Sequence, residues 1–165
     1  MTKVVEGDIE YVALNPEGSM PEIDLMPLTP RTPNLNNKVI YLINSWRVDS
    51  ELAGVLDKTN SFLAGRFPGS TIVPKHKPSP FMSDDPDLWE EMIEKADAFI
   101  YGASQSCATT VWSLTWAAGL EKRGLPGVVV MFETFADAAR KTCLRLGMPV
   151  RWVSCPYPPE PMTEM

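Results

Sequence analysis

The sequence has few of the residues that build metal centres and disulfide frameworks. Its 165 residues include three cysteines and one histidine. The cysteines, Cys107, Cys143 and Cys155, form no CxxC pair, and so low and odd a number argues against a disulfide scaffold. A zinc site with cysteine and histidine ligands is therefore not expected. A Ser-His-Asp triad would have to use His76, and nothing else in the sequence supports one.

The chain also lacks a run of basic residues and a long apolar run. Its formal net charge of -6 argues against a nucleic-acid binder. No apolar stretch reaches the roughly 18 residues that a membrane-spanning helix needs. The start of the chain holds no apolar signal region. We therefore expect a cytoplasmic protein that binds neither nucleic acid nor a membrane.

Glycine motifs that bind phosphate groups are absent as well. No glycine-rich run precedes a Lys-Ser or Lys-Thr pair, and the sequence contains no GxGxxG motif. Nicotinamide binding therefore has little support. FMN remains an option through analogy of fold alone, so the sequence identifies no cofactor.

Between residues 38 and 158, short apolar runs alternate with helical patterns. Such runs are typical of strands buried on both faces, and they are expected at 39–43, 71–73, 97–101, 128–132 and 151–155. Helix caps and apolar residues at helical spacing lie between them. The alternation predicts one α/β domain with a parallel five-stranded sheet, in a flavodoxin-like or Rossmann-like three-layer sandwich.

Residues 1–37 differ in character from this body. They include Pro16, Pro21, Pro27, Pro30 and Pro33, which interrupt regular structure, together with many apolar residues. Both facts fit an extended arm that lies either on the chain's own body or on a neighbouring subunit, and a disordered tail is the alternative. We expect a homo- or hetero-oligomer assembled through this arm. Residues 159–165 form a second, shorter tail.

An uncharged loop, residues 102–110, separates the third expected strand from a helix expected at 111–123. In open α/β sheets, ligands bind at the carboxyl ends of the strands. Free N–H groups and the dipole of the following helix favour an anion or a thiolate there. The sequence therefore predicts a small-molecule site in this loop.

The loop supplies one thiol and several hydroxyls. We predict Cys107, Ser106 and Thr109 as catalytic residues, with the Cys107 thiolate attacking or holding the substrate. Ser104 and Thr110 are predicted to bind the substrate. The alternative is that Ser104 or Ser106 only caps the helix and that Cys107 is a small buried residue.

Neighbouring strand ends offer further contacts. Asn44 and Ser45 follow the first expected strand, and Lys77 follows the second after Lys75 and His76. If the strands are parallel, all of these residues lie at the same edge of the sheet as the loop. We predict Asn44, Ser45 and Lys77 as substrate contacts, with solvated lysines and an exposed histidine as the alternative.

From about Val39 to Pro158 the chain resembles the UGSC-motif (seleno)protein family, which is distantly related to selenoprotein components of glycine reductase-type systems. The order and spacing of short matches carry the resemblance: Leu42-Ile43-Asn44-Ser45, Lys77-Pro78, Ala96-Asp97-Ala98, Leu120-Glu121-Lys122-Arg123-Gly124-Leu125-Pro126, Phe135, Leu146-Gly147-Met148-Pro149 and Pro156-Tyr157-Pro158.

The family's defining motif, a cysteine or selenocysteine followed by Gly-Ser-Cys, falls in the same loop. Without gaps, its two redox positions correspond to Ser106 and Thr109. A small shift instead places Cys107 at the second position and Ser104 at the first. Either way the chain lacks the second thiol or selenol of the motif.

The resemblance implies a substrate class as well as a fold. It points to an enzyme subunit that cleaves or reduces a carbon–heteroatom bond of a small organic acid or amine. The missing redox partner keeps a second hypothesis open, a non-catalytic structural or regulatory subunit of a hetero-oligomeric enzyme. An FMN-binding flavodoxin-like module is a weaker third.

Overall fold

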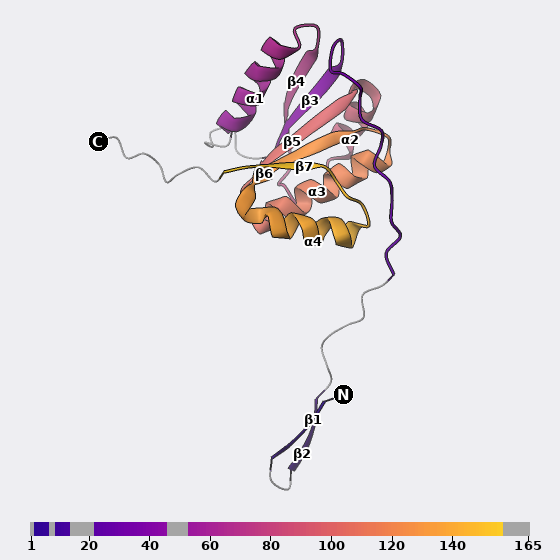
Figure 1. Cartoon of the computed structure of the whole chain (residues 1–165), viewed down its shortest axis with the longest axis vertical. Coiled ribbons are helices and arrows are strands. Elements are labelled where there is room, and N and C mark those ends of the chain that lie inside the picture. The colour runs from indigo at the N-terminus through magenta and orange to yellow at the C-terminus, as the bar shows by residue number, and fades with distance from the viewer. Residues whose placement is uncertain (1, 7–8, 14–21, 46–52, 157–165) are drawn as a thin grey trace, which may run out of the picture.

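Five parallel strands form the centre of the molecule. A computed structural model describes residues 2–6, 9–13, 22–45 and 53–156. The strands are β3 (Val39–Asn44), β4 (Thr71–His76), β5 (Ala98–Ser104), β6 (Gly127–Phe132) and β7 (Trp152–Cys155). They lie in the order β4-β3-β5-β6-β7 (Figure 1). The predicted parallel five-stranded α/β sheet is confirmed, and its 2-1-3-4-5 order is one of the common doubly wound arrangements.

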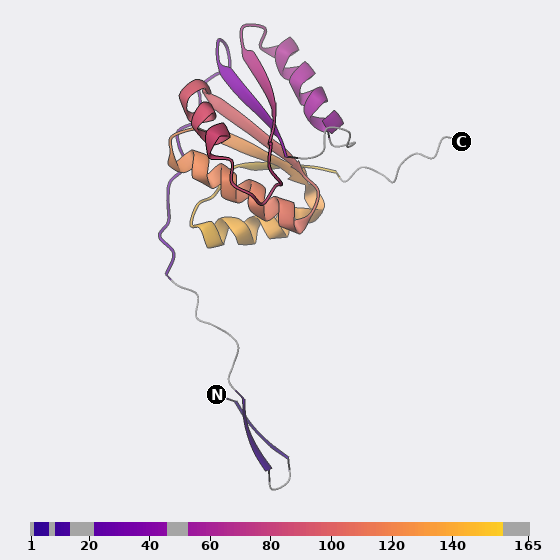
Figure 2. The same cartoon turned by 180° about the vertical axis from the view of Figure 1, so that it is seen from behind.

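Four α-helices connect these strands: α1 (Ala53–Arg66), α2 (Pro86–Lys95), α3 (Cys107–Lys122) and α4 (Ala136–Leu146). A short 3₁₀ turn, η1 (Glu133–Phe135), precedes α4. Because such crossovers are right-handed, the reversal of direction after β4 places α1 on one face and α2, α3 and α4 on the other. The two faces can be compared in Figures 1 and 2.

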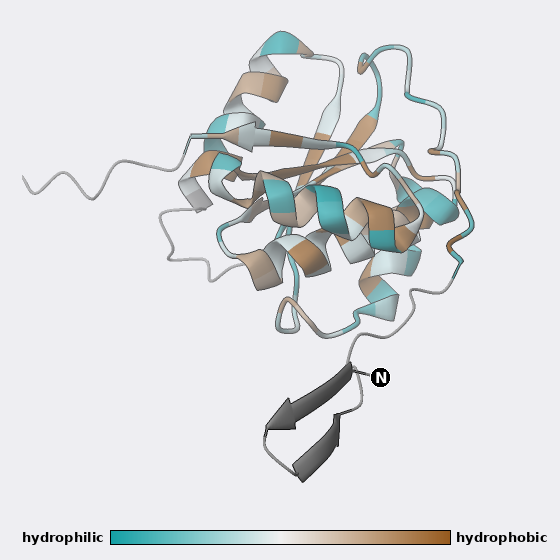
Figure 3. Ribbon diagram, turned by 60° about the horizontal axis from the view of Figure 1, so that its bottom comes forward, coloured by the Kyte–Doolittle hydropathy of each residue, from teal (hydrophilic) through white to brown (hydrophobic). Residues whose placement is uncertain are grey.

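The main core lies between the sheet and α2, α3 and α4. Its strand residues alternate along β3, β5 and β6, and they are Tyr41, Ile43, Phe99, Tyr101, Val129 and Met131. Trp89, Met92 and Leu114 meet them from the helices. Figure 3 shows the apolar character of the strands. This packing explains every second apolar residue of these strands, because successive side chains of a strand point to opposite faces of the sheet.

The opposite face of the sheet is less completely covered. On this face α1 contacts β3, β4 and β5. Ile100, Val128 and Val130 are half-buried there, and 52% of Val153 is exposed. A parallel sheet normally has both faces covered, so this part of the surface stands out.

The described part of the arm, residues 22–37, lies on the chain's own body (Figure 1). The Met26 amide donates to the Gly147 carbonyl at 2.7 Å, and Met26 and Leu28 pack against the main core. These contacts join residues 22–37 to the α/β domain, while assembly of an oligomer through the arm stays a prediction. The tail at 159–165 lies outside the described residues.

A buried ion pair fastens the arm at Thr29. Glu121 at the end of α3 has a fully buried side chain, and it accepts hydrogen bonds from Arg151 at 2.6 Å and the Thr29 amide at 2.8 Å. Arg151 also donates to the Thr29 carbonyl at 2.6 Å, and the Gly127 amide donates to Glu121 at 3.2 Å. One carboxylate thus joins the arm, α3 and the beginnings of β6 and β7.

The first residues form a hairpin that the sequence analysis did not predict. Strands β1 (Thr2–Glu6) and β2 (Ile9–Ala13) pair antiparallel. The five prolines that argued against regular structure all follow Ala13, so they place no restriction on this segment. Figures 1 and 2 show the hairpin separate from the α/β body.

Candidate functional site

The predicted site lies where the strand order reverses. β3 has β4 on one side and β5 on the other, and Asn44 at its end is level with His76 and Gly102. β5 continues to Ser104, three residues beyond its predicted end, and α3 begins at Cys107. The carboxyl ends of β3 and β5 and the first turn of α3 therefore meet at the position where doubly wound sheets bind ligands.

Ser106 caps α3. Its hydroxyl accepts a hydrogen bond from the Thr109 amide at 3.1 Å, and the Thr109 hydroxyl accepts one from the Ser106 amide at 3.0 Å. This reciprocal capping box satisfies backbone donors that the helix leaves free. Ser106 therefore caps α3, and its predicted catalytic role stays a prediction. Thr109 is 1% exposed, so both predicted catalytic hydroxyls have a structural function here.

The cap leads to a stability prediction. We expect Ser106→Ala to lower the free energy of unfolding by about 1 kcal/mol, because the Thr109 amide loses its acceptor. Urea denaturation measures this change. Ser106→Asn keeps a capping oxygen and is the control that should stay close to wild type. Equal stabilities of the alanine and asparagine variants would contradict a capping role.

Ser104 and Thr110 lie beneath the same turn. The Ser104 hydroxyl is buried and shares a hydrogen bond of 2.8 Å with the buried Ser113 of α3. The Thr110 hydroxyl is fully buried and has no hydrogen-bond partner in the part of the chain that the structure describes. Neither hydroxyl is open to solvent. Both groups therefore contribute to the shape of the loop and are not presented on its surface.

Cys107 is the exposed group of this loop. It is the first residue of α3, its thiol is free, and the residue is exposed. The alternative of a small buried cysteine is therefore wrong. An exposed thiol beside the first, unpaired N–H groups of a capped helix occupies the place where a negative charge is most favoured.

The other two cysteines have different surroundings. Cys143 in α4 and Cys155 at the end of β7 are half-buried, and they donate to the carbonyls of Val150 at 3.8 Å and Met131 at 3.4 Å. Burial raises the pKa of both thiols above the ordinary value. Cys107 is therefore the thiol best placed to react.

Lys77 is buried rather than facing solvent. Its ammonium group is 0% exposed, pairs with Asp85, and donates to the carbonyls of Ser79 at 3.3 Å, Pro80 at 2.9 Å and Ser83 at 2.6 Å. It also lies 5.9 Å from the centre of the Trp116 ring. All of these interactions hold the loop between β4 and α2 in shape.

Asp85 completes this buried pair. Burial acts to raise the pKa of its carboxyl, but hydrogen bonds from Lys77 and Ser79 and the Lys77 charge outweigh it and leave the pKa below its ordinary value. The indole N–H of Trp116 donates a hydrogen bond of 2.8 Å to the Phe81 carbonyl in the same loop. The predicted substrate contact of Lys77 thus competes with a complete set of internal partners.

Asn44 borders a small cavity of about 200 Å³ at the same edge. The cavity lies between β3, β4 and α1, and its polar lining also includes Asp57, Asn60 and His76. The sequence analysis did not single out Asp57 or Asn60, because both lie within α1 and not at a strand end. The structure therefore brings Asn44 and His76 to one cavity. The Lys77 amide also donates to the Asn44 carbonyl at 2.7 Å, but the Lys77 side chain does not line this cavity.

Ser45 and Tyr101 form a buried feature that the sequence did not reveal. Tyr101 is 0% exposed, and burial raises the pKa of its phenol. The Ser45 side chain opposes this rise and the Asp85 carboxylate reinforces it. Within the described part of the chain, the Tyr101 hydroxyl has no hydrogen-bond partner. In the sequence Tyr101 was one apolar residue of a strand, with no signal of a polar environment.

In the described part of the chain, no three histidine, cysteine or acidic side chains gather as metal ligands do. None of the described helices has the length and apolar character to cross a membrane.

The chain matches a known protein family. The model of the UGSC family matches residues 12–165, which is nearly the whole chain. The chain belongs to the UGSC family. The family resemblance is thus confirmed, while the distant relationship to glycine reductase-type selenoproteins remains an expectation. No curated protein matches the chain. As a UGSC-family chain, it carries one thiol, Cys107, in the loop where the family motif was expected.

Proposed function

We propose that this chain is a cytoplasmic subunit of an enzyme that acts on a small organic acid or amine. Substrate would bind at the carboxyl ends of β3 and β5, with the Cys107 thiolate as nucleophile. The observation that carries the proposal is the exposed, free thiol at the first residue of capped α3. A substrate carboxylate is favoured there for the same electrostatic reason as the thiolate.

The proposed step is cleavage of a carbon–heteroatom bond. The Cys107 sulfur forms a bond to the substrate carbon, and the heteroatom leaves with the bonding electron pair and takes up a proton from solvent. Water then replaces the sulfur. A net reduction would require a second thiol to attack the Cys107 sulfur and release the carbon as its hydrogen compound. Cys143 and Cys155 are half-buried in other elements, so that thiol would belong to a partner protein.

Alkylation rates test this proposal before a substrate is known. Iodoacetate carries a negative charge and iodoacetamide does not. The rate of alkylation by iodoacetate divided by the rate with iodoacetamide therefore reports the electrostatic potential at a thiol. We expect the ratio at Cys107 to be about two- to fivefold higher in the folded protein than in the same protein unfolded in urea. Mass spectrometry of peptides reads each cysteine separately.

Cys143 and Cys155 are internal controls for that experiment, and they should react more slowly than Cys107 in the folded protein. A panel of small carboxylates and amines, added before iodoacetamide, then searches for compounds that protect Cys107. The proposal would fail if Cys107 showed no preference for iodoacetate and no compound of either class slowed its alkylation.

A non-catalytic subunit is the second candidate. It is favoured by the single thiol in the loop and by the hydroxyls of Ser104, Ser106 and Thr109, which make hydrogen bonds within the protein. The same hydrogen bonds reduce the support for an FMN-binding module. Purification of the native complex distinguishes the candidates, because a regulatory subunit would copurify with a catalytic chain and Cys107→Ala would leave the activity of that complex unchanged.

A further inference from the structure

The two edges of the sheet are built differently. β4 forms one edge and contains Pro74 and Lys75, residues that discourage further strand pairing. β7 forms the other edge, with the sequence Trp-Val-Ser-Cys, and contains neither proline nor a charged residue. Within the described residues, β7 pairs only with β6. Within its four residues, the β7 edge therefore carries neither of the residue types that discourage pairing at β4.

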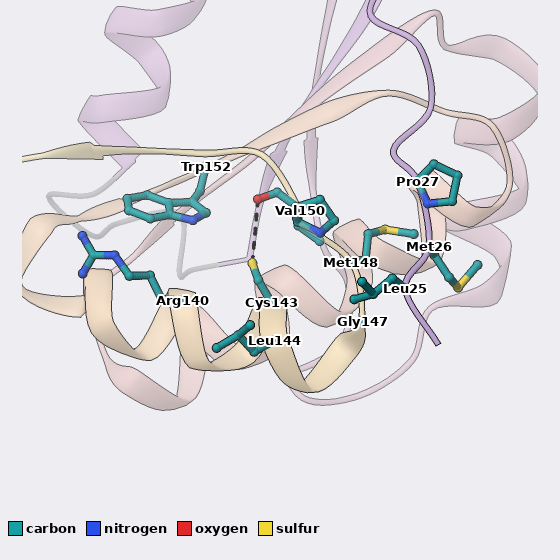
Figure 4. Close-up of a pocket in the computed structure, with 11 residues that line it drawn as sticks. Leu25, Met26, Pro27, Arg140, Cys143, Leu144, Gly147, Met148, Val150 and Trp152 are labelled. Carbon is teal, nitrogen blue, oxygen red and sulfur yellow. Dashed lines mark hydrogen bonds between the residues drawn. The ribbon is translucent and has the colours of Figure 1, made fainter. Parts of the chain in front are cut away.

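Apolar cavities flank β7 on both sides. One, of about 890 Å³, lies between the arm, α4 and β7 (Figure 4), and its apolar lining includes Leu25, Met26, Cys143, Leu144, Met148 and Trp152. The other, of about 340 Å³, lies on the open face of the sheet and is bordered by Ile100, Val128 and Val153. Trp152 lines both cavities.

This arrangement suits the addition of a strand. Side chains of an extended segment alternate between the two faces of a sheet. A strand paired with β7 would direct its side chains alternately towards the two cavities, while its backbone bonded to the β7 edge. The charged residues that line the two cavities are all arginines: Arg31, Arg140 and Arg151.

We propose that the β1–β2 hairpin of a second copy of this chain joins the β7 edge. An isolated two-stranded hairpin is only marginally stable in water, and β1 and β2 pair with nothing but each other in the described structure. Residues 2–13 contain three acidic residues and one lysine, which complements Arg31 and the exposed Arg140 beside β7. Arg140 makes only an exposed ion pair with Asp137, whereas Arg151 is already paired with the buried Glu121. Reciprocal exchange of hairpins between two copies closes a two-fold dimer.

Sedimentation velocity over a range of concentrations tests the proposal. We expect the full chain to be a dimer. Val153→Lys places a charge at the proposed contact, and we expect it to raise the dimer dissociation constant by roughly 100-fold. Deletion of residues 1–13 should also give monomers. Phe62→Lys is the matched control, because Phe62 is 67% exposed on α1 and Val153 is 52% exposed, so both changes leave the core intact.

Hydrogen exchange identifies the surface involved. The amides of residues 152–155 should be more protected in the full-length dimer than in the chain that lacks residues 1–13. A full-length chain that is monomeric at every accessible concentration would overturn the proposal. A dimer that survives the deletion would overturn it as well, because the contact would then be direct pairing of β7 with β7 or another surface.

Discussion

Glu121→Ala should lower the free energy of unfolding by about 3–5 kcal/mol, among the largest effects of any single substitution in this chain. The variant leaves the Arg151 guanidinium, which is 16% exposed, without its carboxylate. It also removes the acceptor of the Thr29 and Gly127 amides. Removing one member of a buried ion pair is costly because the remaining charge stays in a poorly solvated place. Chemical denaturation measures the loss.

Glu90→Ala is the matched control. Glu90 pairs with Arg123 at 2.6 Å, the same distance as Glu121 with Arg151, but the Glu90 and Arg123 side chains are 62% and 39% exposed. We expect the Glu90 variant to lose less than about 1 kcal/mol. Similar losses in the two variants would show that burial does not decide the strength of these pairs.

Lys77→Met should be the second large effect, again about 3–5 kcal/mol. Methionine fills a similar volume but leaves the Asp85 carboxylate and three loop carbonyls without the ammonium group. Lys75→Met is the control, because the pair of Lys75 with Glu91 is partly exposed. A Lys77 variant as stable as the Lys75 variant would mean that the loop does not depend on the buried charge.

The Lys77 effect should depend on pH in a defined direction. Because the folded protein holds the pKa of Asp85 below its ordinary value of 3.8, the pair stabilises the fold fully above that value. The stabilisation is lost as the pH falls through the folded pKa. The difference between wild type and Lys77→Met should therefore be greatest near neutral pH and shrink in acid. Combining Lys77→Met with Asp85→Asn should recover part of the loss at neutral pH.

The order of strands and helices was predictable because apolar runs and helix caps are local signals. The residues at which each strand and helix begins and ends were not predictable in the same way. The second predicted strand stops before Lys75, yet β4 continues through Lys75 to His76, and its Pro74 is tolerated because β4 is an edge strand. α4 begins at Ala136 after the 3₁₀ turn η1 and has no side-chain cap, so no local capping signal marks its start. Strand order depends on contacts distant in sequence, so no local pattern contained it.

The location of the candidate site was predictable from the sequence, but the burial and the partners of its side chains were not. Cys107 and Ser106 lie at a helix start, as the uncharged loop indicated. The burial of Lys77 could not be predicted, because its partners are mainly backbone carbonyls of its own loop, which any sequence supplies. The same holds for Tyr101, whose neighbours Ser45 and Asp85 come from separate segments.

The Glu121–Arg151 pair also constrains the order of events during protein synthesis. Thr29 leaves the ribosome early, but its partners lie 92 and 122 residues further along the chain. At roughly 5–20 residues per second, synthesis of the segment from Thr29 to Arg151 takes at least several seconds. During that time the arm has no Arg151 to pair with. Until then the surfaces of Met26 and Leu28 that later contact the core have no finished binding site. The described arm, residues 22–37, therefore gains its ion-pair anchor only after nearly all of the sheet has been made.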